Sequence, residues 1–201
     1  MTMVATTVTI ERHALRVAVE TAAVAMSTDD LRSHLAGVHC EFRGDALITC
    51  ASDGHRLVQT TVPVLELEGQ AAAAFIRRED TKRLLKTLRC KKSQQSEPVR
   101  VEIGETVKVT GTFETVELEN GNDEPTPPYG KVIPPRREPD DKGPGLFALN
   151  PTYLADLGLL GRLLPSANGA AISTTSAREP VRIDVGNKEI SSIYLIMPMR
   201  I

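Results

Sequence analysis

The sequence predicts an α+β fold in which a strand–helix–three-strand unit occurs three times along the 201 residues. Segments that alternate between apolar and polar residues are typical of strands with one buried face. An apolar stripe at helical spacing follows the first strand of each unit. The same element order returns after about 65–70 residues, which indicates an internal repeat.

The first unit covers residues 6–64. Residues 6–11 alternate as a strand, and residues 12–26 place apolar side chains on one face of a helix. Strands are predicted at 34–42, 46–51 and 57–64, and the Arg43-Gly44-Asp45 sequence is typical of a turn between the first two.

The second unit repeats this order. Residues 71–77 predict a strand, and residues 79–90 predict a helix whose inner positions are leucines. Glycines at 104 and 111 separate three further predicted strands, at 98–103, 106–110 and 113–118.

The third unit starts with a predicted strand at 146–149. The helix after it begins at Pro151, a position where the first helical turn tolerates proline. Its leucine stripe is followed by predicted strands at 170–174, 181–185 and 193–197. Residues 121–145, with seven prolines, favour extended, solvated chain and separate the second unit from the third.

The composition is that of a folded, non-membrane protein. A hydrophobic fraction of 41% supports a packed core, and a net charge of −2 argues against a protein that coats nucleic acid through its overall charge. The absence of tryptophan makes a base-stacking surface unexpected. No apolar run approaches the ~20 residues of a membrane span, and the N-terminus lacks the pattern of a secretory signal. The widely spaced Cys40, Cys50 and Cys90 indicate unpaired thiols in a reducing compartment, so a cytoplasmic location is expected.

Charge is segregated along the second unit. Residues 77–92 contain eight basic and two acidic side chains, whereas residues 101–124 contain seven acidic and one basic side chain. Lys82, Lys86 and Arg89 follow i, i+4, i+7 spacing, so they share a helix face opposite the leucines. Either this face is simply solvated, or it faces DNA phosphates while the acidic strands lie on the far side.

Two groups of residues could form a reactive site, but each also has a purely structural explanation. The Ser52-Asp53-Gly54-His55 sequence contains hydrolase residue types, but neighbours along a strand point to opposite faces, and Asp-Gly favours a turn. A metal site would draw on histidines and cysteines whose spacing matches no zinc pattern: His34, His39, Cys40, Cys50 and His55. We therefore expect no enzyme activity, no metal and no cofactor.

Four segments resemble one family. Residues 52–57, Ser-Asp-Gly-His-Arg-Leu, and residues 194–201, Tyr-Leu-Ile-Met-Pro-Met-Arg-Ile, are similar to two motifs of the bacterial DNA polymerase III beta subunit, the sliding clamp. Residues 147–154 resemble the strand-to-helix entry of that clamp's last half-domain, and residues 128–134 resemble the end of its middle domain. The resemblance implies a DNA-clamp fold of β-α-β-β-β halves, with helices on one face of antiparallel sheets.

The resemblance also implies two binding surfaces. A hydrophobic cleft would bind short linear motifs of DNA polymerase, clamp-loader and repair proteins. Its residues would be Leu35, Ser52, Gly54, His55, Arg56, Leu57, Pro134, Tyr153, Ile196, Met197, Pro198 and Met199. Double-stranded DNA would be bound without sequence preference by Arg32, Lys82, Lys86 and Arg89.

The chain departs from the family in length. Residues 1–138 would form one complete clamp-type domain, and residues 139–201 would form half of another. A lone half exposes one side of its core, so we expect it to pair with the same half of another subunit. Four chains would supply the twelve halves of the family's ring.

Two functions fit these expectations. The first is a processivity factor that binds DNA and tethers replication or repair proteins. The second is a clamp-like regulator, such as a phage or mobile-element product in a bacterial cell, that binds the same peptides without encircling DNA. Both are non-enzymatic.

Overall fold

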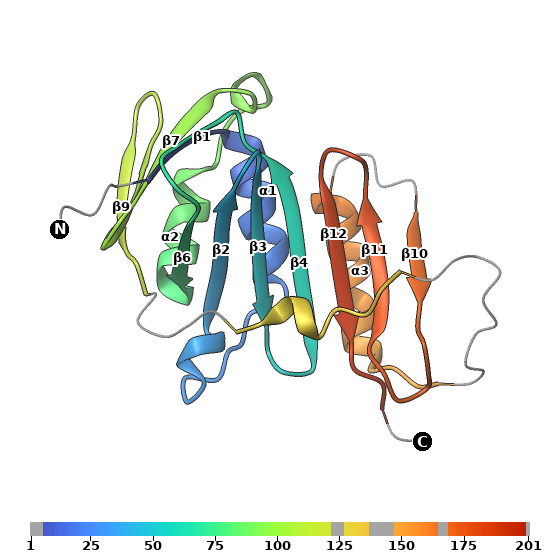
Figure 1. Ribbon diagram of the computed structural model, residues 1–201. Helices are drawn as coiled ribbons and strands as arrows, with labels where there is room; N and C mark the ends of the chain where they lie inside the picture. Colours follow the sequence, from blue (N-terminus) through green and yellow to red (C-terminus); the bar gives the residue numbers. More distant parts are fainter. Residues whose placement is uncertain (1–5, 122–126, 137–146, 165–168, 200–201) are drawn as a thin grey trace.

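A computed structural model describes residues 6–121, 127–136, 147–164 and 169–199. These residues form two antiparallel sheets, of five and seven strands, together with three α-helices (Figure 1). This is the predicted α+β fold. No described helix has both the length and the apolar character that a membrane span needs.

The first unit has the predicted element order. It comprises β1 (Thr6–Glu11), α1 (Arg12–Ala23), β2 (Gly37–Arg43), β3 (Ala46–Ser52) and β4 (Arg56–Pro63). Strand β2 begins three residues later than predicted because Ser33–Leu35 form a 3-10 turn, η1.

The second unit also keeps the predicted order. It comprises β6 (Ala72–Arg77), α2 (Arg78–Thr87), β7 (Pro98–Ile103), β8 (Thr106–Thr110) and β9 (Thr115–Glu119). Two short elements were not predicted: β5 (Glu66–Glu68), which pairs with β1, and the 3-10 turn η2 (Lys92–Gln94).

The third unit comprises α3 (Pro151–Leu163), β10 (Ala170–Ser173), β11 (Val181–Gly186) and β12 (Ser191–Ile196). The side chain of Asn150 caps α3 by accepting a hydrogen bond from the Thr152 amide. The predicted strand at 146–149 is wrong for its described part, residues 147–149, because Ala148 forms only an isolated bridge to Met199. Residue 146 and the C-terminal residues 200–201 lie outside the described residues.

The first two units exchange their first strands. Strand β6 joins the sheet of the first unit by pairing with β2, and β1 joins the sheet of the second unit by pairing with β7. The third unit continues the larger sheet through β12, which pairs with β4, giving the order β10-β11-β12-β4-β3-β2-β6.

The two faces of the seven-stranded sheet differ. Helix α1 packs on β3 and β4, and α3 packs on β11, so one side is a helix face (Figure 1). The opposite, outer face is crossed by residues 127–136, here called the outer segment, which contain the 3-10 turn η3 (Tyr129–Lys131) (Figure 1). Alternation along the strands therefore assigns each side chain to one of two surfaces.

Candidate functional site

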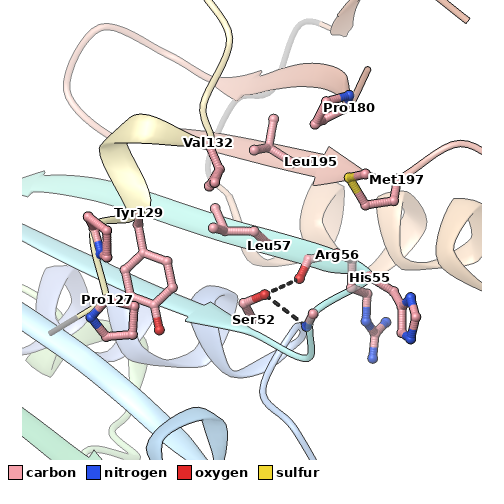
Figure 2. A pocket seen from close by; sticks show the side chains of 12 residues that line it. Ser52, His55, Arg56, Leu57, Pro127, Tyr129, Val132, Pro180, Leu195 and Met197 are labelled. Carbon is pink, nitrogen blue, oxygen red and sulfur yellow. Dashed lines mark hydrogen bonds between the residues drawn. The ribbon is translucent and has the colours of Figure 1, made fainter. Parts of the chain in front are cut away.

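A pocket of about 280 Å³ lies on the outer face, where β4 meets β12 beneath the outer segment (Figure 2). Most of its lining is apolar, which suits a partner that inserts hydrophobic side chains. Its lining residues are Ser52, Gly54, His55, Arg56, Leu57, Pro127, Pro128, Tyr129, Val132, Pro180, Leu195 and Met197.

The floor of the pocket is fixed by strand register. Leu57 and Leu195 are directly opposite each other across the β4–β12 pair, and both are buried with Cys50 in one cluster. Tyr129 and Ile133 of the outer segment pack against this cluster. The pocket is therefore a joint product of the first unit, the third unit and the outer segment.

One wall is a tight turn between β3 and β4. Gly54 has φ +92°, a conformation that favours glycine. Asp53 Oδ1 accepts hydrogen bonds from the amides of His55 and Arg56, at 2.9 and 3.0 Å. The Ser52 hydroxyl donates to the Arg56 carbonyl at 2.8 Å and accepts from the Gly54 amide at 3.1 Å (Figure 2). The Ser52 and Asp53 side chains therefore stabilise the turn through backbone hydrogen bonds, a structural role rather than that of a hydrolytic centre.

The outer segment is anchored on the sheet by an aromatic contact. The rings of Tyr129 and His39 meet edge to face, with centroids 5.4 Å apart, and His39 also stacks on Phe75. Burial lowers the pKa of His39, whose Nε2 lies 3.0 Å from the His34 carbonyl oxygen. Burial disfavours the charged form of Tyr129 as well, and therefore raises the pKa of its hydroxyl. Both groups are therefore neutral in the folded protein near pH 7, as suits an apolar wall.

Arg56 joins the pocket rim to α3. Its guanidinium contacts the carboxylates of Asp53 and Asp156 and lies 4.8 Å from the centre of the Tyr153 ring. The Tyr194 hydroxyl donates to Asp156 at 2.9 Å. Burial alone would lower the pKa of Arg56, but the two carboxylates outweigh it and raise that pKa.

We expect Asp156→Asn to lower the free energy of unfolding by about 1–2 kcal/mol, because it weakens hydrogen bonds to a charged group in a half-buried network. Asp30→Asn is the matched control, since Asp30 also pairs with an arginine, Arg78, but is 83% exposed. Asp30→Asn should lower the free energy of unfolding by no more than about 0.5 kcal/mol. Urea unfolding of both variants measures the difference, and equal losses would contradict the structural role given to Asp156.

The structure brings half of the predicted cleft residues into this pocket. Ser52, Gly54, His55, Arg56, Leu57 and Met197 line it. Ile196 does not, because it follows Leu195 in β12 and its side chain is fully buried on the helix face. Tyr153 does not line the pocket, and its ring contacts the Arg56 guanidinium. Met199 forms a bridge to Ala148, and neither Met199 nor the preceding Pro198 lines the pocket. Leu35 is in η1, and the Pro134 carbonyl accepts a hydrogen bond from Arg182, so neither is part of the lining.

Sequence reasoning missed the lining residues Pro127, Pro128, Tyr129, Val132, Pro180 and Leu195. The parity of β12 could have identified Leu195, because Leu195 and Met197 share a face. The outer segment has no strand pattern, and its prolines are typical of a linker. The resemblance of residues 128–134 brought only Pro134 into the predicted cleft.

The predicted DNA-binding residues fall into two places. Lys82, Lys86 and Arg89 are exposed around α2, and none of them forms an ion pair with another described residue. Arg32 is elsewhere: it pairs with Asp29 and reaches the Asp53 carbonyl at the turn beside the pocket. Lys82 and Lys86 are on α2, whereas Arg89 follows the end of the helix at Thr87, so the prediction that all three share one helix face is wrong for Arg89. The three exposed side chains are here called the basic surface on α2. Arg32 lies beside the pocket but does not line it, and its contact with DNA stays a prediction.

The metal hypothesis gains no geometric support from the described residues, where no group of three or more His, Cys, Asp or Glu side chains could hold an ion. Cys40 is buried, and burial raises its pKa to about 12. Such a thiol is a poor nucleophile and a poor ligand at neutral pH.

Comparison with known proteins places this geometry in context. The family model of the DNA polymerase III beta subunit, central domain, matches residues 9–121. The beta sliding clamp of Haemophilus influenzae is 31% identical over 128 residues, which are 62% of this chain and 33% of that protein. The chain therefore aligns with about a third of this relative's length.

Solved structures of similar fold cover more of the chain. The DNA polymerase III subunit beta from Pseudomonas aeruginosa superposes on 97% of this chain and 66% of its own, with a TM-score of 0.78 at 18% identity. The beta subunit from Thermotoga maritima gives the same TM-score and identity over 97% and 65%. At this identity the likeness concerns the fold, and it includes the third unit, which lies beyond the family match.

Proposed function

This chain belongs to the DNA polymerase III beta subunit family, and from that membership we propose that it is a sliding-clamp-like processivity factor. It binds double-stranded DNA without sequence preference and tethers replication or repair proteins through the pocket at β4 and β12. The family points to a non-enzymatic role. The observation that carries the proposal is the separation of an apolar pocket on the outer face from a basic surface on α2.

The pocket supports binding of a short peptide. Leu57 and Leu195 give a buried apolar floor, and Val132 and Met197 add exposed apolar walls. A peptide with leucine and phenylalanine anchors would bury its side chains there, and a glutamine could bond the polar turn at 52–56. The neighbouring Leu35, Pro134, Tyr153, Pro198 and Met199 are proposed to contact the peptide beyond the pocket itself.

The basic surface supports contact with a phosphate backbone. Lys82, Lys86 and Arg89 are free of ion pairs to described residues, so their charge is available to phosphates. On the acidic strand β9, Glu117 and Glu119 are exposed while Val116 and Leu118 are buried, so the carboxylates lie on the sheet's solvent side. The phosphates are attracted to the basic surface on α2 and repelled by the carboxylates of β9, so DNA binds on the α2 side.

A peptide-binding regulator that does not hold DNA is the second candidate. It is favoured by α3, where Arg162 is the only basic residue, so the third unit adds little to a phosphate-binding surface. Residues 1–138 are proposed as the complete domain and 139–201 as the half-domain in both cases. The candidates differ in one property that is directly measurable, which is simultaneous binding of duplex and peptide by the same chain.

A further inference from the structure

The first two units show how two units of this fold complete one another. The strand that follows each helix pairs with the strand that precedes the helix of the other unit: β2 with β6, and β7 with β1. Helices α1 and α2 pack together on the same side. As a result Val38, on the helix face of β2, is fully buried.

The third unit has the same parts, and within the described residues no further unit pairs with it as the first two pair with each other. Strand β10 follows α3, pairs with β11, and has its other edge unpaired within the described chain. Ile172 of β10 lies opposite the fully buried Ile183, so both face the helices, yet Ile172 is 58% exposed. The edge residues Ala170–Ser173 include no charged residue or proline, the usual protection of an edge strand.

The segment before α3 is also half paired. Strand β1 of the first unit pairs on one edge with β5, which directly follows β4, and on the other with β7. The bridge between Ala148 and Met199 corresponds to the β1–β5 pair, because Met199 follows β12 as β5 follows β4. The edge of residues 147–149 that corresponds to the β1–β7 pair has no partner strand in the described chain.

Helix α3 presents a surface of small and apolar residues on the side opposite Asp156, with the exposed Arg162 one turn beyond Gly158. Leu154, Gly158 and Gly161 share one stripe at i, i+4, i+7, and Asp156, which binds Arg56 of the first unit, lies on the opposite flank. Leu154 is exposed, and a Cβ built on either glycine would meet nothing within 4 Å. A second helix could approach closely along this stripe.

We infer that the third unit pairs with the third unit of a second copy of this chain about a two-fold axis. Residues 147–149 of each copy add to the free edge of β10 of the other, and the two α3 helices pack through Leu154, Gly158 and Gly161. The shared domain then repeats the exchange of first strands seen between the first two units.

A second copy fits this surface better than another occupant because each copy supplies what the other lacks. By analogy with the β2–β6 pair, β10 needs a strand that precedes a helix, and residues 147–149 of the second copy supply it. By analogy with the β1–β7 pair, residues 147–149 need a strand that follows a helix, and β10 of the second copy supplies it. A two-fold axis satisfies both pairings with one contact, as isologous interfaces do. The exposed Ile172 of each copy is then covered, as Val38 already is.

Gly158→Lys tests the inference in the full-length chain. Lysine favours a helix over glycine, and a Cβ at position 158 meets nothing within 4 Å, so the fold should persist. At the interface it places two charges where the helices meet, and we expect the dimer dissociation constant to rise at least about 30-fold. Sedimentation velocity over a concentration series measures this, and a far-ultraviolet circular dichroism melt verifies folding.

Ile172→Lys is the second variant, on β10, and carries the test if Gly158→Lys should unfold. Phe113→Lys is the matched control, since Phe113 is 84% exposed in the β8–β9 turn, away from the third unit. Hydrogen exchange should show protection of the Ala170–Ser173 amides in the wild type that is lost in both interface variants. A monomeric wild type, or folded interface variants that associate like Phe113→Lys, would overturn the inference.

This test is separate from peptide binding, because each chain contains a whole pocket. A folded Gly158→Lys monomer that still binds peptide agrees with both proposals. Loss of assembly in that variant alone bears on the interface, and failure of the wild-type dimer to bind peptide bears on the proposed function.

Discussion

Met197→Asp is expected to weaken binding of a peptide with a glutamine/leucine/phenylalanine motif by about 30-fold or more. Met197 is 43% exposed on the pocket wall, and its amide is held by the His55 carbonyl at 2.9 Å. The backbone bond survives the substitution, so the pocket keeps its shape. A carboxylate in an apolar wall must be desolvated when an apolar anchor binds, which costs about 2 kcal/mol or more at a central contact.

Leu65→Asp is the matched control for this prediction. Leu65 is also an exposed apolar residue, at 59%, and it lies outside the pocket. Fluorescence anisotropy of a labelled peptide should show wild-type affinity for Leu65→Asp. Equal affinities for the two variants would place the peptide site elsewhere.

Reversing the basic surface on α2 is expected to remove association with duplex DNA. The triple variant of Lys82, Lys86 and Arg89 to Glu replaces three phosphate-binding charges with repulsive ones. Loss of three contacts should reduce the slope of log affinity against log salt by about 3. Peptide affinity should stay unchanged, because the pocket is on the outer face.

The control for charge reversal carries the same change of net charge on other surfaces. Arg43, Arg100 and Lys108 are exposed on strands and pair with Glu41 or Glu102. Their triple change to Glu should leave most duplex binding intact. It lowers stability by placing new carboxylates beside Glu41 and Glu102, so a circular dichroism melt verifies that the variant is folded. A similar loss of duplex binding in both triple variants would show that overall charge, rather than the α2 surface, controls association.

Much of the fold was accessible from the sequence because its local signals are strong. Alternation in β2, β3 and β4 and the leucines of α2 predicted those elements within a few residues. The exchange of first strands was not predictable, because the alternation of apolar and polar residues in β1 and β6 is the same whichever sheet the strand joins. Strand β5, three residues long, is defined by its pairing with β1 rather than by its own pattern.

The pocket was predictable only where resemblance and strand parity agreed. The turn at Asp53-Gly54 has a sequence signature, and the structure places it at the wall of the pocket. Ile196 was expected in the cleft, yet the pairing of β12 with β4 turns Leu195 outward instead. Tyr129 could not be identified, because its place on the sheet depends on contact with His39, ninety residues earlier in the chain.

Simultaneous binding tests the proposed function most directly. A labelled motif peptide is first saturated with the chain at low salt, about 50 mM, where phosphate contacts are strongest. Unlabelled duplex is then added while peptide anisotropy is followed. The account predicts a further rise, from a ternary complex, that the triple α2 variant abolishes. Unchanged peptide anisotropy with the wild-type chain, or release of the peptide, would contradict a tethering role and favour the regulator that binds peptides without DNA.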